Sequence, residues 1–221
     1  MAEYAKSTET KRKILDACRT LFYDKGYIAT KYTDISELSG INEGLIYYHF
    51  KRKDCLGGLI FEEIVNDTMS KAAGLTENSK TPMLAAGVNC RVLWRLTYAS
   101  EVFKRFNQEL IMDRVPIKIA RSNDAAWYQT YNERYNLGLS STDVHLINIA
   151  HTAMESELIL ASIDGGLDMT EKQIADFDIR TELELFRIDF NSIEAVLRES
   201  ATLCSSIDLK MSEGFQVELA M

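Results

Sequence analysis

Apolar residues recur along most of the chain at spacings of three and four, the period of an α-helix that buries one face. Between Thr8 and Lys25 one such stripe contains Ile14, Leu15, Cys18, Leu21 and Phe22. The segment from Thr142 to Ile163 is apolar on two sides, which predicts a helix with two packing partners. Prolines number only two in 221 residues. The pattern predicts an all-α protein of about nine or ten helices.

Short elements follow the first long helix. Thr33 is a candidate N-cap for a short helix, and Gly40 can take the left-handed conformation that ends it. Asn42 can then cap another helix, on which Ile46 and Phe50 share one face. Helix, short helix, glycine turn and short helix make a helix-turn-helix unit, whose second element enters the major groove of DNA.

The other side of this last helix carries a mixture suited to a groove reader. Gly44 would let the helix axis approach a nucleic-acid backbone, and Leu45 could touch a thymine methyl. Tyrosine and histidine side chains can donate hydrogen bonds to phosphate. The residues concerned are Glu43, Tyr47, Tyr48 and His49. The plainer alternative is a surface patch without function.

Charge is unevenly distributed along the chain. Residues 1–55 hold 10 Lys and Arg against 8 Asp and Glu, whereas the remainder holds 15 against 25, and the net charge is −8. This balance argues against non-specific coating of nucleic acid but allows a small basic face on an acidic body. Basic residues that could form it, or could be ordinary solvated charge, are Lys6, Lys11, Arg12, Lys13, Lys51, Arg52 and Lys53.

The N-terminal quarter resembles a known family at many positions at once. They are Ile14-Leu15-Asp16-Ala17, Leu21-Phe22, Gly26-Tyr27, Thr30, Thr33, Ile35, Gly40-Ile41, Gly44, Ile46-Tyr47-Tyr48-His49-Phe50-Lys51 and Lys53. In this combination the segment is similar to the DNA-binding domain of the tetracycline-repressor (TetR) family of bacterial transcription regulators. The resemblance implies an all-α homodimer that binds double-stranded operator DNA and is released by a small-molecule effector. It also implies a DNA-binding domain over residues 1–52 and an effector-binding and dimerisation domain over 53–221.

Roles for single residues follow from the resemblance. Thr33 would touch phosphate at the start of the second helix, and Lys53 would do so at the start of the fourth. Bases would be read from Asn42, Glu43, Gly44 and Leu45, and Tyr47, Tyr48, His49 and Lys51 would contact backbone or base edges. Three positions depart from the family pattern. Glu43 stands where lysine is common and Leu45 where threonine is common, which changes the expected operator sequence. Arg52 stands where a helix-capping serine is common.

Gly57 and Gly58 fall inside the predicted fourth helix, which links the two domains. Two glycines within a helix cost roughly 1 kcal/mol each relative to alanine. Either they allow close packing against the first helix, or they soften a joint that pivots when an effector binds.

Aromatic residues of the middle helices are candidates for an effector site. They are Trp94, Tyr98, Phe106, Trp127 and Tyr131. Aromatic pairs four residues apart also serve as ordinary core, and that alternative stays open. If these helices enclose a cavity, its aromatic rings and few polar tips favour a largely apolar or planar effector.

His151 and Glu155 lie four residues apart on one helix face, so they could pair, contact the effector or bind a metal. No third metal ligand is evident nearby, and we expect neither a metal nor a cofactor. A helical metal-dependent enzyme built on this pair is one alternative, although the chain lacks the usual hydrolase and nucleotide-binding motifs. A TetR-like regulator controlled by a protein partner is another.

Dimerisation is expected through residues 142–163 and about 179–206, by resemblance to the four-helix interfaces of the family. Ser141 is the expected cap of the first segment, and Thr170 with Gln173 forms a capping box for the helix between them. Residues beyond Lys210 have the composition of a loosely held tail. Without a signal peptide or a membrane-length apolar run, we expect a cytoplasmic bacterial protein, associated with the nucleoid when bound to DNA. The four cysteines have no metal or redox spacing.

Overall fold

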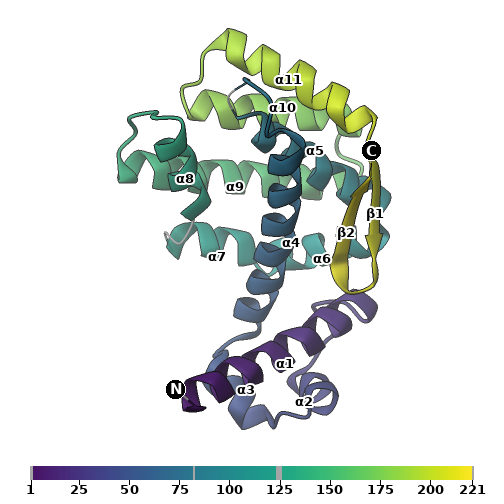
Figure 1. The fold of residues 1–221 in the computed structure, drawn as a ribbon. Coiled ribbons are helices and arrows are strands. Elements are labelled where there is room, and N and C mark those ends of the chain that lie inside the picture. The colour runs from purple at the N-terminus through teal and green to yellow at the C-terminus, as the bar shows by residue number, and fades with distance from the viewer. Residues whose placement is uncertain (1, 82, 123–125, 221) are drawn as a thin grey trace.

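The computed structural model describes residues 2–81, 83–122 and 126–220, without the side chains of residues 2–6, 126 and 127. Eleven α-helices occur in this described part, followed by one two-stranded hairpin. The prediction of an all-α fold with an N-terminal head and a larger helical body is confirmed (Figure 1). The head contains α1 (Ala2–Asp24), α2 (Tyr32–Ser39) and α3 (Glu43–His49), and α4 (Lys53–Leu75) runs from it into the body.

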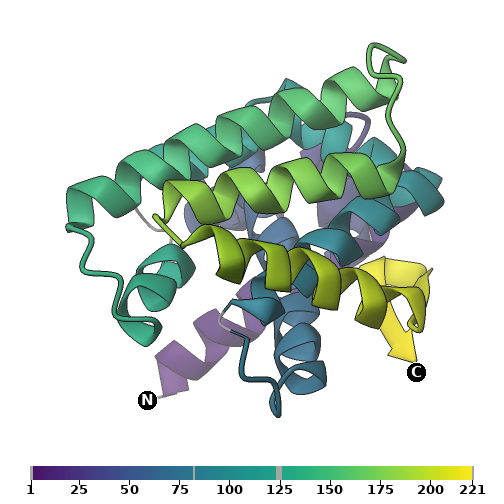
Figure 2. The ribbon, with the colours of Figure 1, turned by 90° about the horizontal axis from the view of Figure 1, so that it is seen from above.

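The body is built around α5 (Leu84–Ala99), which is buried on most sides. Around it lie α6 (Glu101–Met112), α7 (Val115–Ser122), α8 (Ala126–Arg134), α9 (Ser141–Ile163), α10 (Glu171–Leu185) and α11 (Phe190–Ser205). Seen from above, α10 lies between α9 and α11 (Figure 2). Among the described helices, none is long and apolar enough to cross a membrane.

Local signals explain several helix boundaries. Gly40 has a φ of 68° and ends α2, as predicted. The predicted capping box of Thr170 and Gln173 is present at the start of α10. At α9 the cap is Ser140 rather than Ser141, because the Ser140 hydroxyl accepts from the Asp143 backbone N–H.

Two predictions about the head were wrong. The sequence indicates a flexible tail over residues 1–7, but the first helix begins at Ala2, so the segment from Ala2 to Thr8 is helical. Thr33 does not cap α2, which begins one residue earlier at Tyr32. The Asp34 carboxylate instead accepts the backbone N–H of Lys31 at 2.6 Å, and this bond serves as the cap.

The C-terminal segment is also not the predicted tail. Strands β1 (Asp208–Ser212) and β2 (Gln216–Ala220) form an antiparallel hairpin joined by a short 3₁₀ turn. Phe215, at that turn, is 3% exposed and lies with its ring 5.3 Å from that of Tyr23 and 4.6 Å from that of Phe106. Lys71 of α4 donates to the Val217 carbonyl at 2.6 Å. The hairpin therefore belongs to the core between head and body.

The glycine pair of α4 is a site of close packing. A Cβ on Gly57 would lie 2.7 Å from Leu110 of α6 and 2.8 Å from the Tyr27 ring. A Cβ on Gly58 would lie 2.9 Å from Ile119 of α7. The packing alternative is therefore favoured, although the partners are α6, α7 and the loop after α1 rather than α1 itself.

Replacement of Gly57 by alanine should lower the free energy of unfolding by about 1–3 kcal/mol, since the added methyl group overpacks this contact. Gly74→Ala in the same helix is a matched control, because no described residue outside the adjoining helix backbone lies within 4 Å of a Cβ at that position. The control should gain up to about 1 kcal/mol from helix propensity. Urea unfolding of both variants measures these changes. If Gly57→Ala raised the free energy of unfolding as much as Gly74→Ala does, Gly57 would not be a site of close packing.

Candidate functional site

The exposed side of α3 is set by the residues at its two ends. The Asn42 side-chain oxygen accepts the Leu45 backbone N–H at 2.9 Å, which is the predicted N-cap. Ile46 is fully buried and Phe50 is 7% exposed, so they hold α3 against the head core. Gly44 and Tyr48 then face outward, and Tyr48 is 77% exposed. The helix presents an aromatic side chain that has no role in the head's own core.

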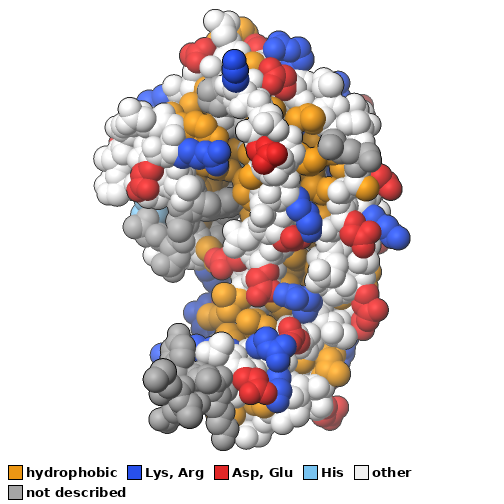
Figure 3. Space-filling model, viewed as in Figure 1, with side chains coloured by type: hydrophobic (Ala, Val, Ile, Leu, Met, Phe, Trp, Pro, Cys, Tyr) orange, Lys and Arg blue, Asp and Glu red, His pale blue; other side chains and the backbone are white. Residues whose placement is uncertain are grey.

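The predicted DNA-contacting residues divide into two groups by exposure. Those that are exposed are Thr33, Asn42, Gly44, Tyr47, Tyr48 and Lys51. Those that are half-buried are Glu43, Leu45, His49 and Lys53. The rings of Tyr32 and Tyr47 stack with centroids 4.1 Å apart, which brings the start of α2 beside α3. Lysine and arginine side chains lie on the head among acidic ones (Figure 3).

Lys53 is directed inward at the start of α4. Its ammonium group donates to the carbonyls of Tyr27, Ile28 and Thr30 at 3.0, 3.1 and 3.2 Å. It also lies 4.7 Å from the centroid of the Tyr27 ring. Burial lowers the pKa of Lys53. A phosphate contact by Lys53 would compete with these internal bonds, and it stays a prediction.

Arg52 precedes α4 without a side-chain hydrogen bond that caps the helix. It forms an ion pair with Asp54, which also accepts from Lys118 of α7 at 2.9 Å. Burial acts to raise the pKa of Asp54, but the hydrogen bonds from Arg52 and Lys118 outweigh it and lower the pKa to about 2. Arg52 is thus partly neutralised by its neighbour.

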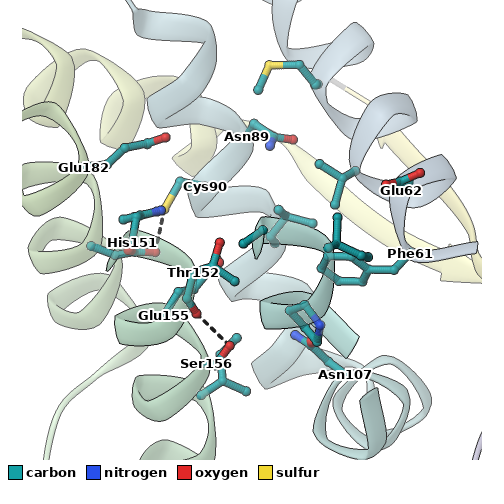
Figure 4. A pocket seen from close by; sticks show the side chains of 18 of the residues that line it. Phe61, Glu62, Asn89, Cys90, Asn107, His151, Thr152, Glu155, Ser156 and Glu182 are labelled. Carbon is teal, nitrogen blue, oxygen red and sulfur yellow. Dashed lines mark hydrogen bonds and ion pairs between the residues drawn. The ribbon is translucent and has the colours of Figure 1, made fainter. Parts of the chain in front are cut away.

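A cavity of about 340 Å³ lies inside the body, lined by side chains from α4 to α10. Phe61 and Glu62 of α4 face His151, Glu155 and Glu182 across it (Figure 4). Its wall mixes apolar and aromatic side chains with amides, hydroxyls and carboxylates. Pockets of this size and lining bind small organic molecules.

A buried polar network crosses one wall of the cavity. His151 Nε2 lies 2.8 Å from Asp178 Oδ1, and its Nδ1 lies 2.7 Å from the Tyr128 hydroxyl oxygen. Asp178 Oδ2 also accepts from Trp94 Nε1 at 2.7 Å and from the Cys90 thiol at 3.2 Å. One carboxylate therefore holds groups from α5 and α9 in place.

The charges of this network stabilise each other. Burial disfavours the charged form of His151, but the hydrogen bond to Asp178 and the nearby carboxylates outweigh it and raise its pKa to about 10. Burial likewise acts to raise the pKa of Asp178, yet His151 and the other donors lower it. At neutral pH the two groups form a buried ion pair.

Two further carboxyl groups on the wall have raised pKa values, in contrast to Asp178. Burial, reinforced by the charge of Asp178, raises the pKa of Glu155 to about 8. Burial also raises the pKa of Glu182. Both groups lie on the cavity side of their helices, beside the ion pair.

The predicted effector residues have mixed outcomes. Trp94, Tyr131, His151 and Glu155 line the cavity. Phe106 does not line it, because it is buried between Phe22 and Phe215 in the core that joins head and body. Tyr98 is 39% exposed and also lies outside the lining. The side chain of Trp127 lies outside the described residues.

Sequence reasoning missed the acidic residues of α10. Asp178 and Glu182 lie four apart within the inward stripe formed by Ile174, Ile179 and Leu183. A carboxylate on the buried face of an amphipathic helix is uncommon and was the available signal. It also changes the interpretation of His151, whose partner is Asp178 of α10 rather than Glu155.

The hydrogen bonds of His151 argue against the alternative of a metal site. Both ring nitrogens of His151 are within hydrogen-bonding distance of Asp178 and Tyr128, which leaves neither nitrogen for a metal. No group of three or more candidate metal-ligating side chains occurs among the residues that the structure describes. The geometry therefore favours a structural role for His151 in the cavity wall.

Comparisons with known proteins agree with the head geometry. Residues 14–56 match the family model of bacterial regulatory proteins, tetR family. The transcriptional regulator TtgR of Pseudomonas putida is 42% identical over 45 residues, which cover 20% of this chain and 21% of TtgR. QacR of Staphylococcus aureus is 44% identical over 61 residues, which cover 28% of this chain and 30% of QacR. The sequence matches thus span under a third of these relatives.

The whole fold has a counterpart among solved structures. The crystal structure of RolR in complex with resorcinol aligns over 88% of this chain and 95% of RolR, with a TM-score of 0.54 and 16% identity. At this identity the match concerns the fold alone. Residues 14–56 therefore match the tetR family of bacterial regulatory proteins, and the fold of the chain is similar to that of RolR.

Proposed function

We propose that the protein binds a near-palindromic operator as a homodimer and is released when a small molecule occupies the body cavity. The exposed side of α3 carries the proposal for DNA binding. Gly44 allows close approach of the helix to the duplex, and the outward Tyr48 can contact phosphate or a base edge. Exposed Lys51, just after α3, adds a charge that attracts phosphate.

A dimer is needed because paired half-sites require two reading helices at a fixed separation. Exposed apolar side chains on α9 and α10 support an interface there, with Leu146 61% and Phe177 49% exposed. Ala150 and Ala153, also exposed on α9, would allow close helix packing. The apolar stripe of α11 is instead buried inside its own chain, where α11 packs on α5. We therefore place the interface on residues 142–163 and on α10.

Helix α6 is suited to couple the cavity to the head. Asn107 and Ile111 line the cavity, whereas Arg105 and Glu109 contact the head. Arg105 donates to the Tyr23 carbonyl at 2.6 Å, and Glu109 accepts the Ile28 backbone N–H at 2.9 Å. A ligand that displaces α6 would pull on the end of α1 and the following loop.

Release then follows from linkage. An effector that favours a body shape in which the reading helices are misplaced must lower DNA affinity by the same factor by which DNA lowers effector affinity. Because the effector lowers DNA affinity, the free protein would act as a repressor if its operator overlaps a promoter.

Tyr48→Ala should weaken operator binding by about tenfold or more, because a side chain that contacts the duplex is removed. The measurement is fluorescence anisotropy of the purified protein with duplexes tiled across the DNA beside its own gene, at fixed salt. Tyr48 contributes little to the head core, so the variant should melt like the wild type. Lys53→Ala would not separate DNA binding from the stability of the head, since it also removes three internal hydrogen bonds.

Tyr98→Ala is the matched control, since Tyr98 is a partly exposed tyrosine of the body. It should leave DNA affinity unchanged. A wild-type protein that is monomeric and binds none of the duplexes would contradict the proposal, as would equal affinities of the Tyr48 and Tyr98 variants.

Control by a protein partner is the second candidate. A solid core beneath an exposed apolar patch would favour it, but the body contains a cavity large enough for a small molecule. RolR, which shares the fold, was crystallised with resorcinol, a small aromatic diol. Both observations favour a small-molecule effector. An enzymatic role for His151 and Glu155 has no support, because His151 is engaged by Asp178 and Tyr128.

A further inference from the structure

The ionisable side chains that line the cavity are mostly acidic. Four carboxyl groups belong to the lining, those of Glu62, Glu155, Asp178 and Glu182. His151 is the basic side chain among the described lining residues, which include neither lysine nor arginine. His151 balances Asp178 as its ion-pair partner. The rest of the wall therefore attracts positive charge when its carboxyl groups ionise.

Two of these carboxyl groups have no hydrogen-bond partner among the described residues. Neither Glu155 nor Glu182 makes a hydrogen bond within the described part of the chain, although Glu182 is only 8% exposed. An ionised carboxylate in such surroundings is costly unless it is paired. A bound molecule that brings a positive charge and N–H donors would remove this cost.

A third, uncharged group also lacks a partner. Asn89 lines the cavity and is 3% exposed, and its side-chain oxygen has no hydrogen-bond partner among the residues that the structure describes. Buried amide oxygens of this kind are usually paired. Figure 4 shows Asn89 on the wall between the Glu182 side and the Glu62 side of the cavity. This amide and the two glutamates thus all lack donors.

The remaining wall is suited to the apolar part of such a molecule. Leu93, Phe103 and Ile159 offer aliphatic and aromatic surface, and Trp94 and Tyr131 add aromatic side chains. Aromatic faces attract organic cations through cation–π interaction, most strongly where water is excluded.

We propose that the effector is an organic amine, whose ammonium charge is balanced by Glu155 and Glu182 and whose apolar part packs on the apolar and aromatic side chains of the lining. The proposal rests on the proposed function only in taking this cavity as the effector site. A neutral phenol could donate hydrogen bonds here but would offer no charge to balance these carboxyl groups when they ionise. An anion of the same size would be repelled.

The pH dependence of binding supplies a second signature. The groups around Glu155 are His151 on its own helix, Asp178 and Glu182 of α10, and Cys90 of α5 and Tyr128 of α8. The pKa of Glu155 is about 8 in the free protein, so a bound cation must first ionise it. Affinity for an amine should therefore rise between pH 6 and pH 8, by up to about 50-fold.

The test is calorimetric titration of the purified full-length protein with three matched probes: 4-phenylbutylamine, 4-phenylbutanol and 4-phenylbutanoate. We expect the amine to bind about tenfold or more tightly than the alcohol at pH 8. The carboxylate should bind weakest. Glu155→Gln and Glu182→Gln should each reduce the preference for the amine, and Glu155→Gln should remove most of its pH dependence.

Glu157→Gln is the matched control, because Glu157 lies two residues further along α9, is exposed, and does not line the cavity. It should bind the three probes like the wild type. Thermal melting of each variant establishes that it is folded.

An amine that binds no better than the alcohol, or not at all, would overturn the inference. So would an unchanged amine preference in both cavity variants. These outcomes are distinct from a failure of the proposed function. That failure would be a wild-type protein that binds none of the operator duplexes, and it is measured without any amine, alcohol or carboxylate probe.

Discussion

Asp178→Ala is expected to lower the free energy of unfolding by about 3–5 kcal/mol, because it leaves a buried cation without its partner. The substitution also leaves Trp94 Nε1 without its acceptor at 2.7 Å. The measurement is urea unfolding at a fixed protein concentration, since a dimer couples stability to concentration. Glu184→Ala is a control on the same helix, where the side chain is exposed, and it should change stability little.

The decrease in the free energy of unfolding caused by Asp178→Ala should depend on pH. The pKa of His151 is about 10 in the folded protein, above its ordinary value of 6.5, so its stabilising contribution is complete below pH 6.5. That contribution is lost as pH rises through 10. The pKa of Asp178 is lowered from 3.8, so its contribution is present above that pH and lost in more acidic solution. The difference between wild type and variant should therefore be largest between about pH 4 and 6.5 and shrink toward pH 10. A difference independent of pH would contradict the ion pair.

Phe215→Ala is expected to cost about 3–5 kcal/mol of unfolding free energy, as large-to-small changes of a buried phenylalanine do. The ring fills the space between Tyr23 of the head and Phe106 of the body, so its loss leaves a cavity at their junction. Operator affinity should also fall, because the head is held less firmly. Urea unfolding and anisotropy with the operator duplex measure the two effects.

Phe190→Ala serves as the comparison, because Phe190 is 67% exposed at the start of α11. Its loss should change stability by well under 1 kcal/mol, apart from a weak contact with Arg180. If both variants were equally stable, the hairpin would be the loose tail that composition predicts.

The places where prediction failed share a physical cause. The hairpin is recognisable only when Phe215 is seen against Tyr23 and Phe106, residues far away in the sequence. Lys53 reads as a surface cation until its ammonium group is placed on three carbonyls of the loop after α1. Each of these contacts joins segments more than 20 residues apart, as the separations of 23 to 26 for Lys53 illustrate.

The sequence by itself determined what depends on neighbours within one or two helical turns. The left-handed Gly40, the Asn42 cap, the inward Ile46 and the capping box at Thr170 all follow from interactions across three or four residues. Only the tertiary structure decided which partner His151 takes, since Asp178 lies 27 residues away on another helix. It also decided that Glu155 and Glu182 border one cavity, because burial and long-range charge have no local signature in the chain.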